Sequence, residues 1–397
     1  MEHKTRIKGN VHYVGVNDRN KHRFEGMWPL PYGVSYNSYL IDDEMVALVD
    51  TVDICYFEVY LRKIKQVIGE RPINYLIINH MEPDHSGSIR LIKQHYPEII
   101  IVGNKQTFGM IEGFYGVTGE QYLVKEGDFL ALGHHKLRFY MTPMVHWPET
   151  MMTFDETDGV LFSGDGFGCF GTVDGGFLDT RINVDKYWGE MVRYYSNIVG
   201  KYGSPVQKAL QKLGGLPISA ICSTHGPVWT ENIAKVVGIY DRLSRYDADE
   251  GVVIAYGSMY GNTEQMAEAI AEELSAQGVK NIVMHNVTKS HPSYIIADIF
   301  RYKGLIIGSP TYSNQIFPEV EALLSKILLR EVKGRYLGYF GSFTWAGAAV
   351  KRLAEFAEKS KFELVGDPVE MKQAMKDLTY TQRENLARAM ADRLKKD

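Results

Sequence analysis

Cysteine is scarce in this sequence, and the spacing of its cysteines is not typical of a metal or redox site. The three residues, Cys55, Cys169 and Cys222, lie far apart and form no C-x-x-C pair. This absence disfavours a disulfide framework, an all-cysteine zinc site and an iron–sulfur or rubredoxin-type centre. We therefore expect three small buried side chains. Any electrons that the protein uses must come from outside the chain.

Long hydrophobic runs and a large net charge are also missing. The longest apolar runs, such as EIIIVG and GVVIAY, are too short to cross a bilayer. A net charge of −4 gives no reason to expect nucleic acid or an anionic membrane as a partner. The first residues, MEHKTRIKGN, lack the apolar core of a signal peptide, so the sequence favours a cytoplasmic protein.

A chain of 397 residues is longer than a single hydrophobic core usually serves, which favours two domains. Up to about residue 250, short β-rich runs alternate with loops that contain glycine and proline. Beyond it, strand and helix patterns alternate as in a doubly wound α/β fold. The polar segment SRYDADEG, residues 244–251, is the expected junction, which predicts domains at 1–249 and 250–397.

Side chains that bind metals gather in the stretch IINHMEPDHSGSIR, residues 77–90, directly after a strand-like run. The candidate ligands in this stretch are His80, Glu82, Asp84 and His85. Further candidates, each after another strand-like run, are His146, Asp165 and His225. Because such loops can meet at one edge of a sheet, we expect these side chains to converge.

These groups are too many for one zinc ion, which three imidazoles and a carboxylate would satisfy. We therefore predict two metal ions that share a bridging carboxylate. Asp165, alone on its loop between glycines, is the expected bridge. The remaining ligands divide into His80, Glu82 and His146 on one metal and Asp84, His85 and His225 on the other.

Each residue taken alone has a simpler explanation. A lone histidine such as His225 is more often structural, and Asp165 in SGDG is equally typical of a turn. The cluster at 80–85 favours the metal interpretation, because four structural explanations would be needed within six residues. His134 and His135, in the turn-like LGHHKL, are expected at the surface.

The second part opens with a strand-like run followed by YGSMYGNTE and a helix from about Thr263, which Gly278 should end. The backbone N–H groups of this loop and the helix N-terminus can hold a phosphate. Two later loops, 309–318 and 341–350, combine aromatic and small polar residues, as a planar and partly polar ring requires. Without a G-x-G-x-x-G fingerprint, the pattern favours FMN over FAD or NAD.

The candidate FMN-binding residues are Ser258, Met259, Tyr260, Gly261, Asn262, Thr263, Ser309, Pro310, Thr311, Tyr312, Asn314, Ser342, Phe343, Thr344, Trp345, Ala346 and Gly347. Among them, Tyr312 and Trp345 are the candidates for contact with the flavin ring.

The pattern H-x-E-x-D-H, with His146, Asp165 and His225, resembles the metallo-β-lactamase superfamily. Glu82 stands where that superfamily usually has histidine, and this version with a flavodoxin-like domain after it is similar to the flavodiiron proteins, or A-type flavoproteins. The resemblance implies a mixed α/β and α+β chain. An αββα sandwich of the metallo-β-lactamase type would be followed by a flavodoxin-like parallel sheet. The three FMN loops are similar to those of flavodoxins, although Tyr260 replaces the usual threonine.

Glu82 also separates two kinds of chemistry. Added carboxylate favours a harder cation and a higher oxidation state, which suits iron that changes its charge rather than zinc. The resemblance implies an enzyme in which FMN passes electrons to two non-haem irons that reduce dioxygen to water, nitric oxide to nitrous oxide, or both. It implies no catalytic residues beyond the metal ligands. A dizinc hydrolase with a flavodoxin-like module, and an electron carrier with a metal-free scaffold, stay open as alternatives.

The resemblance further implies a homodimer or a dimer of dimers. It implies rubredoxin or a rubredoxin reductase as electron donor, or reduced coenzyme F420, as in some archaeal relatives. The segment 18–40 is expected to line the diiron pocket by analogy.

Overall fold

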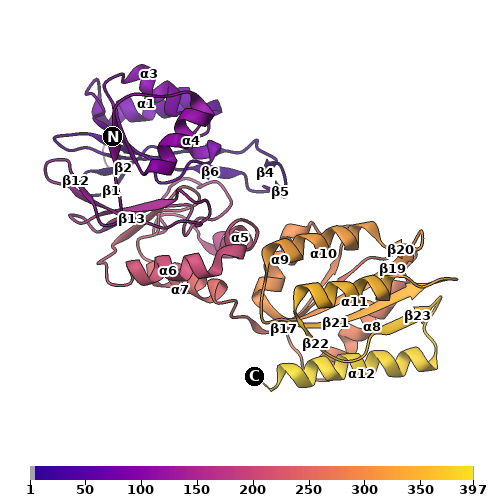
Figure 1. Ribbon diagram of the computed structural model, residues 1–397. Coiled ribbons are helices and arrows are strands. Elements are labelled where there is room, and N and C mark those ends of the chain that lie inside the picture. The colour runs from indigo at the N-terminus through magenta and orange to yellow at the C-terminus, as the bar shows by residue number, and fades with distance from the viewer. Residues whose placement is uncertain (1–4, 397) are drawn as a thin grey trace. The chain divides into compact units, whose positions relative to one another are not determined.

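The computed structural model describes residues 5–396, which form two compact units (Figure 1). The first contains the residues up to Tyr195 together with Tyr202–Asp241, and the second contains Ser196–Lys201 and the residues from Arg242 on. The first strand of the second unit, β17, spans Asp249–Tyr256.

The first unit contains two mixed β-sheets. The strands of one are, in spatial order, β1 (Arg6–Lys8), β2 (Val11–Tyr13), β7 (Tyr39–Ile41), β8 (Ala47–Val49), β9 (Tyr75–Ile77), β10 (Ile100–Gly103) and β11 (Gln121–Leu123). Those of the other are β12 (Phe129–Ala131), β13 (Lys136–Met141), β14 (Met151–Asp155), β15 (Val160–Gly164) and β16 (Ala220–Ser223). Strand β9 is parallel to β8 and β10, and β15 is parallel to β16.

Apolar residues on the inner faces of the two sheets form one core. Ile77 of β9 and Phe162 of β15 belong to the same buried cluster. The helices of this unit are α1 (Phe57–Ile68), α2 (Pro83–Ser86), α3 (Ile89–His95), α4 (Lys105–Tyr115), α5 (Asp185–Tyr194), α6 (Gly203–Leu213) and α7 (Ile233–Ser244). In Figure 1, α1, α3 and α4 lie outside one sheet and α6 and α7 outside the other, which is the αββα arrangement that the sequence predicts.

Short segments complete the first unit. The ribbons β3 (Val16–Asp18) with β6 (Val34–Tyr36), and β4 (Arg23–Phe24) with β5 (Trp28–Pro29), precede β7. A 3₁₀ turn covers Ile54–Tyr56. A π-helical stretch over Tyr195–Val199 and a second 3₁₀ turn over Gly200–Tyr202 contain Ser196–Lys201, which belong to the second unit.

The second unit is a parallel sheet in the order β18 (Ile282–Asn286), β17, β19 (Tyr302–Tyr312), β21 (Tyr336–Phe343) and β22 (Glu363–Leu364). Strands β20 (Gln315–Ile316) and β23 (Val369–Lys372) pair with β19 and β21. Its helices are α8 (Asn262–Ala276), α9 (Pro292–Arg301), α10 (Pro318–Arg330), α11 (Ala349–Ser360) and α12 (Asp377–Leu394). This strand order is that of flavodoxin-like sheets and confirms the predicted fold class.

Both faces of this sheet are covered. Ile254 and Ile306 pack against α8 and α12, and the alternate residues Val253 and Leu305 are also buried. Strands with two buried faces read as continuous apolar runs, which explains the pattern GVVIAY.

Several details differ from expectation. Ser309–Tyr312 and Ser342–Phe343, expected in loops, continue β19 and β21. Ser309 and Pro310 pair with β21, Thr311 and Tyr312 pair with β20, and the end of β21 pairs with β23. Cys55 is exposed, whereas Cys169 and Cys222 are buried as expected. His135, expected at the surface, is 1% exposed, because its Nδ1 lies 2.9 Å from a carboxylate oxygen of the buried Asp155. Within residues 5–396, the helices are too short or too polar to span a membrane.

Ile77→Ala should lower the free energy of unfolding of the first unit by about 2–5 kcal/mol, because it leaves a cavity at a fully buried position of β9, where the 77–90 stretch begins. Urea unfolding followed by circular dichroism measures this change. Val59→Ala on α1, where the side chain is 39% exposed, is the matched control and should change the value by no more than about 0.5 kcal/mol. Equal effects of the two substitutions would contradict the proposed core.

Candidate metal centre and flavin loops

The predicted metal ligands come from loops at one edge of both sheets in the first unit. His80 and Glu82 follow β9, and Asp84 and His85 lie in the short helix α2. The loop from β13 to β14 carries His146. Asp165 follows β15, and His225 follows β16. Because β14 is antiparallel to β15, its start lies beside the carboxyl end of β15, and the structure brings the loops together as the sequence predicts.

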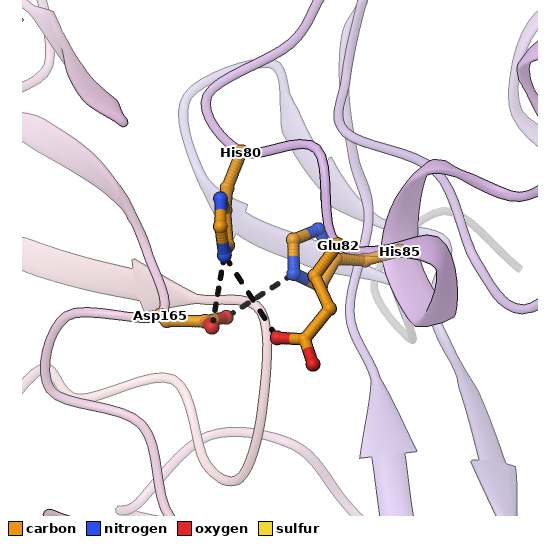
Figure 2. A group of neighbouring side chains, drawn as sticks. All are labelled: His80, Glu82, His85 and Asp165. Atoms are coloured by element: carbon orange, nitrogen blue, oxygen red, sulfur yellow. Dashed lines mark ion pairs between the residues drawn. The ribbon is translucent and has the colours of Figure 1, made fainter. Parts of the chain in front are cut away.

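Asp165 lies at the centre of this group and presents a different oxygen to each side (Figure 2). Its Oδ2 is 3.1 Å from His146 Nε2 and 3.5 Å from His80 Nε2. Its Oδ1 is 3.3 Å from His85 Nε2 and 3.6 Å from His225 Nε2. The carboxylate therefore separates the predicted ligands into two groups.

The remaining carboxylates complete the two groups. Glu82 Oε2 lies 3.1 Å from His146 Nε2 and 3.8 Å from His80 Nε2. Asp84 Oδ1 lies 3.6 Å from His85 Nε2, and its Oδ2 lies 3.4 Å from His225 Nε2. We call the first group, His80, Glu82 and His146 with Asp165 Oδ2, the His80 half. The His85 half is Asp84, His85 and His225 with Asp165 Oδ1.

Both halves fit a metal ion. Ligand atoms around an ion with bonds of about 2.0–2.2 Å lie somewhat more than 3 Å apart, as these do. Among residues 5–396, the buried atoms without a hydrogen-bond partner include Nε2 of His80, His85 and His225 and both carboxylate oxygens of Asp84. Each such atom costs about 1–3 kcal/mol when nothing satisfies it. A pair of cations would satisfy all of them.

Hydrogen bonds from outside the two halves orient several of the ligands. His80 Nδ1 lies 2.6 Å from a carboxylate oxygen of Glu149, which also accepts the backbone N–H of Met81. His225 Nδ1 lies 2.8 Å from the backbone carbonyl oxygen of Ser35. The hydroxyl of Thr224 donates to Asp165 Oδ1. These partners fix which ring nitrogen points to the centre.

Sequence reasoning missed Glu149, which is fully buried. Its place three residues after His146, on the same loop, was the available signal, because a metal-binding histidine needs a partner for its second ring nitrogen.

Charge and burial compete in setting the pKa values of the metal-free centre. Burial alone would lower the pKa of His85, but the charges of Asp165 and Asp84 raise it to about 10. Burial raises the pKa of Glu82 to about 7, and the charge of Asp84 adds to this rise. Burial lowers the pKa of His80, so this ring is neutral. The metal-free site therefore carries protons that a cation would replace.

An open pocket of about 600 Å³ reaches the centre at Glu82 and Asp84. Lys21, Phe24 and Glu25 line one side, so part of the segment 18–40 does border the pocket. The other lining residues are Asp53, Ile54, Pro83, Gly87, Arg90, Leu91, Phe114 and Tyr115. The pocket therefore brings a small molecule as far as two of the predicted ligands.

The three predicted flavin loops lie beyond the carboxyl ends of β17, β19 and β21, and hydrogen bonds link them. The hydroxyls of Thr263 and Ser342 are 2.9 Å apart, and Thr311 Oγ1 accepts the backbone N–H groups of Ala348 and Ala349. Gly261 precedes α8 with φ +92°, a conformation that glycine adopts without strain.

Three of the predicted flavin-binding residues are buried in strands of the sheet, and one of them is Ser342 of β21. Ser309 and Pro310 are buried within β19, and the Ser309 hydroxyl accepts the backbone N–H of Phe317. Others are open: Tyr260 is 92% exposed, Trp345 82% and Tyr312 49%. Asn314 lies in the turn between β19 and β20, with φ +58°. The exposed aromatic side chains leave room for a planar ring.

Comparison with known proteins covers both units. Residues 34–226 match the ODP family of β-lactamase domains, and residues 254–395 match the flavodoxin family. The anaerobic nitric oxide reductase flavorubredoxin of Vibrio vulnificus is 32% identical over 363 residues, which cover 90% of this chain and 73% of that protein. The flavorubredoxin of an Escherichia coli strain is likewise 32% identical, over 90% of this chain and 76% of that protein.

Solved structures give the same result. The rubredoxin oxygen:oxidoreductase of Desulfovibrio gigas is 31% identical with a TM-score of 0.93, over 98% of this chain and 97% of that chain. The flavodiiron protein of Giardia intestinalis is 27% identical with a TM-score of 0.93, over 98% of this chain and 95% of that chain. With this similarity in sequence and in fold along both units, the chain belongs to the family of flavodiiron proteins.

Proposed function

We propose that this protein is a flavodiiron oxidoreductase that reduces dioxygen to water, nitric oxide to nitrous oxide, or both. The observation that carries the proposal is the position of Asp165, whose two oxygens face two separate sets of ligand atoms. When bound, FMN would supply electrons and a pair of irons would take up the diatomic substrate. The chain's own residues hold these groups and control access to them.

The ligand assignment follows the two halves. We assign His80, Glu82 and His146 to one iron and Asp84, His85 and His225 to the other, with Asp165 as the bridge. The mixture of imidazoles with Glu82, Asp84 and Asp165 supports iron, because a carboxylate-rich site stabilises the higher oxidation state. The similar proteins are named as reductases and an oxidoreductase, which favours redox chemistry over the dizinc hydrolase. The buried atoms without partners argue against a metal-free scaffold.

The pocket at Glu82 and Asp84 is the proposed route for the gas. Phe24 borders this pocket, and its ring meets the imidazole of His225 edge-on with the centroids 5.3 Å apart. This apolar ring shields one side of the centre from water. Lys21 and Asp53, paired at 3.2 Å, lie among the pocket's lining residues and keep it polar.

The second unit is the proposed FMN domain. The N-terminus of α8, with the loop from Ser258 to Thr263, offers backbone N–H groups and a helix dipole to the phosphate. Tyr312 and Trp345 are the proposed contacts of the flavin ring, because they are exposed aromatics at the end of β19 and in the loop after β21. We propose 1–249 as the diiron domain and 250–397 as the FMN domain.

The names of the similar proteins also suggest the donor. Flavorubredoxin and rubredoxin oxygen:oxidoreductase both refer to rubredoxin, so we propose a rubredoxin or its reductase as electron donor, with reduced coenzyme F420 as the alternative. We further propose a cytoplasmic homodimer or dimer of dimers. Anaerobic turnover with each gas, using reduced rubredoxin, would decide between dioxygen and nitric oxide as the preferred substrate.

Asp165→Ala should reduce consumption of both gases by more than about 100-fold, the loss that removing even an outer partner of a ligand can cause. FMN should stay bound, because the substitution lies in the other unit. A gas electrode and the flavin absorbance measure the two quantities. Asp128→Ala, at an exposed carboxylate of the same unit, is the control and should leave turnover unchanged. Full activity of Asp165→Ala would refute the proposal.

Adding Fe²⁺ to the anaerobic, metal-free protein at pH 7.5 should release protons. His85, with its pKa raised to about 10, is protonated at this pH and must become neutral to bind a metal. A pH-indicator dye measures the release. In His85→Gln the release should fall by about one proton per chain, because the titrating ring is gone. No difference between the two proteins would contradict the role of His85.

Trp345→Ala should weaken FMN binding by about 1 kcal/mol, or roughly five-fold, through the loss of one aromatic contact. Titration of the FMN-free protein with FMN, followed by flavin fluorescence, measures the dissociation constant. Tyr380→Ala, at a 42% exposed aromatic of α12, is the control and should not change it. An unchanged constant in Trp345→Ala would remove this residue from the site.

A further inference from the structure

The two halves of the metal centre differ in what lies behind their imidazoles. His80 Nδ1 faces the Glu149 carboxylate at 2.6 Å. His225 Nδ1 faces only the neutral backbone carbonyl of Ser35, at 2.8 Å. Nδ1 of His85 is buried and has no hydrogen-bond partner within residues 5–396. A histidine backed by a carboxylate is therefore found in the His80 half, whereas neither histidine of the His85 half has one.

The nearby carboxylate of Asp50 does not serve as a hydrogen-bond partner for the imidazole of His85. Asp50 is buried and close enough to His85 to influence its charge. However, its Oδ1 accepts the backbone N–H of Asn79 and its Oδ2 accepts the side-chain amide of Asn79. Asp50 therefore holds the loop before His80 and makes no hydrogen bond to the imidazole of His85.

The two oxygens of the bridging carboxylate of Asp165 also differ, and this difference again favours the His80 half. Asp165 Oδ1, which faces the His85 half, also accepts a hydrogen bond from the hydroxyl of Thr224. Asp165 Oδ2 faces His80 and His146. A carboxylate oxygen that shares its lone pairs with a hydroxyl donates less electron density to a cation. Two independent features thus favour the His80 half.

Glu149 also links the parts of the His80 half. It lies three residues after His146 on the same loop. Its Oε1 lies 2.6 Å from His80 Nδ1 and also accepts the backbone N–H of Met81. Met81 stands between His80 and Glu82 in the chain. The single carboxylate therefore sets the ring orientation of His80 and the position of the backbone that leads to Glu82.

We infer that Glu149 is a positioning residue that makes the His80 half the tighter of the two metal positions, so that this half fills first and empties last. An imidazole that donates its second N–H to a carboxylate is a more basic ligand and is held in one orientation. Loss of such a partner weakens metal binding by about 10- to 100-fold. The inference rests on the proposed function, because it requires that both halves bind a metal.

The test uses the full-length, FMN-loaded protein, freed of metal and titrated anaerobically with Fe²⁺ in a calorimeter. The wild type should bind in two steps of unequal affinity. A wild-type sample given one equivalent of ⁵⁷Fe²⁺ should show one main Mössbauer quadrupole doublet, since one half fills before the other. In Glu149→Gln the tighter step should weaken by about 10- to 100-fold while the weaker step stays unchanged, and the same sample should show two doublets.

The chain offers a matched control. Asp155 Oδ2 lies 2.9 Å from His135 Nδ1, and Asp155 is as buried as Glu149. Asp155→Asn therefore removes the same kind of carboxylate–imidazole contact in the same unit but outside the metal centre. It should leave both binding steps unchanged. Glu149→Asp keeps the charge on a shorter side chain and should recover part of the tighter step, and it serves as the test variant if Glu149→Gln does not fold.

The outcomes separate this inference from the proposed function. Two equal steps in the wild type, or a Glu149→Gln variant that weakens both steps equally, overturns the role of Glu149 and leaves the diiron assignment intact. A wild-type protein that binds no Fe²⁺ overturns both. Selective weakening of the tighter step in Glu149→Gln, absent from Asp155→Asn, supports the inference, whereas selective weakening of the weaker step overturns it.

Discussion

The structure of the first unit depends on the need to neutralise a buried set of charges. Asp165, His80, His85 and His225 are almost inaccessible to water, and Glu82 and Asp84 are nearly so. Carboxylates and imidazoles in such a place are costly unless each atom finds a partner. Several of their atoms have none in the described chain, and those atoms converge on two points on either side of Asp165. Cations bound at those two points would give these atoms the partners that they lack.

The fold brings these residues together because the strands that precede them end at one edge of the sandwich. Parallel strands in both sheets end at the same edge of the sandwich, and the loops that follow carry the ligands. The rigid strands thereby supply positions, while the loops supply chemistry. The same principle operates in the second unit, where loops after β17, β19 and β21 meet through hydrogen bonds of Thr263 and Thr311.

The outer partners of the ligands explain how a symmetric count of residues produces an unsymmetric centre. Each half contains two histidines and one carboxylate of its own, and both share Asp165. Glu149 and Thr224 nonetheless act on opposite sides of the bridge, one behind the His80 half and one on the oxygen of the His85 half. The difference lies in hydrogen bonds to neighbouring loops rather than in the ligand set.

The sequence by itself indicated the doubly wound second domain, a flavin, a two-metal site and the residues to examine, because strand periodicity, ligand spacing and a strand-to-helix turn are local patterns. The αββα sandwich of the first domain was implied by the family resemblance. It also indicated the two ligand sets on either side of Asp165, since the chemistry of two metals requires that division. It did not pair Glu149 with His80, which is 69 residues away, and it could not show the burial of His135, which depends on Asp155. It placed Ser309 and Pro310 in a loop, although pairing with β21 extends the strand through them. Those features were decided by the tertiary structure, because they arise from contacts between segments that only the packed sheets bring within hydrogen-bond distance.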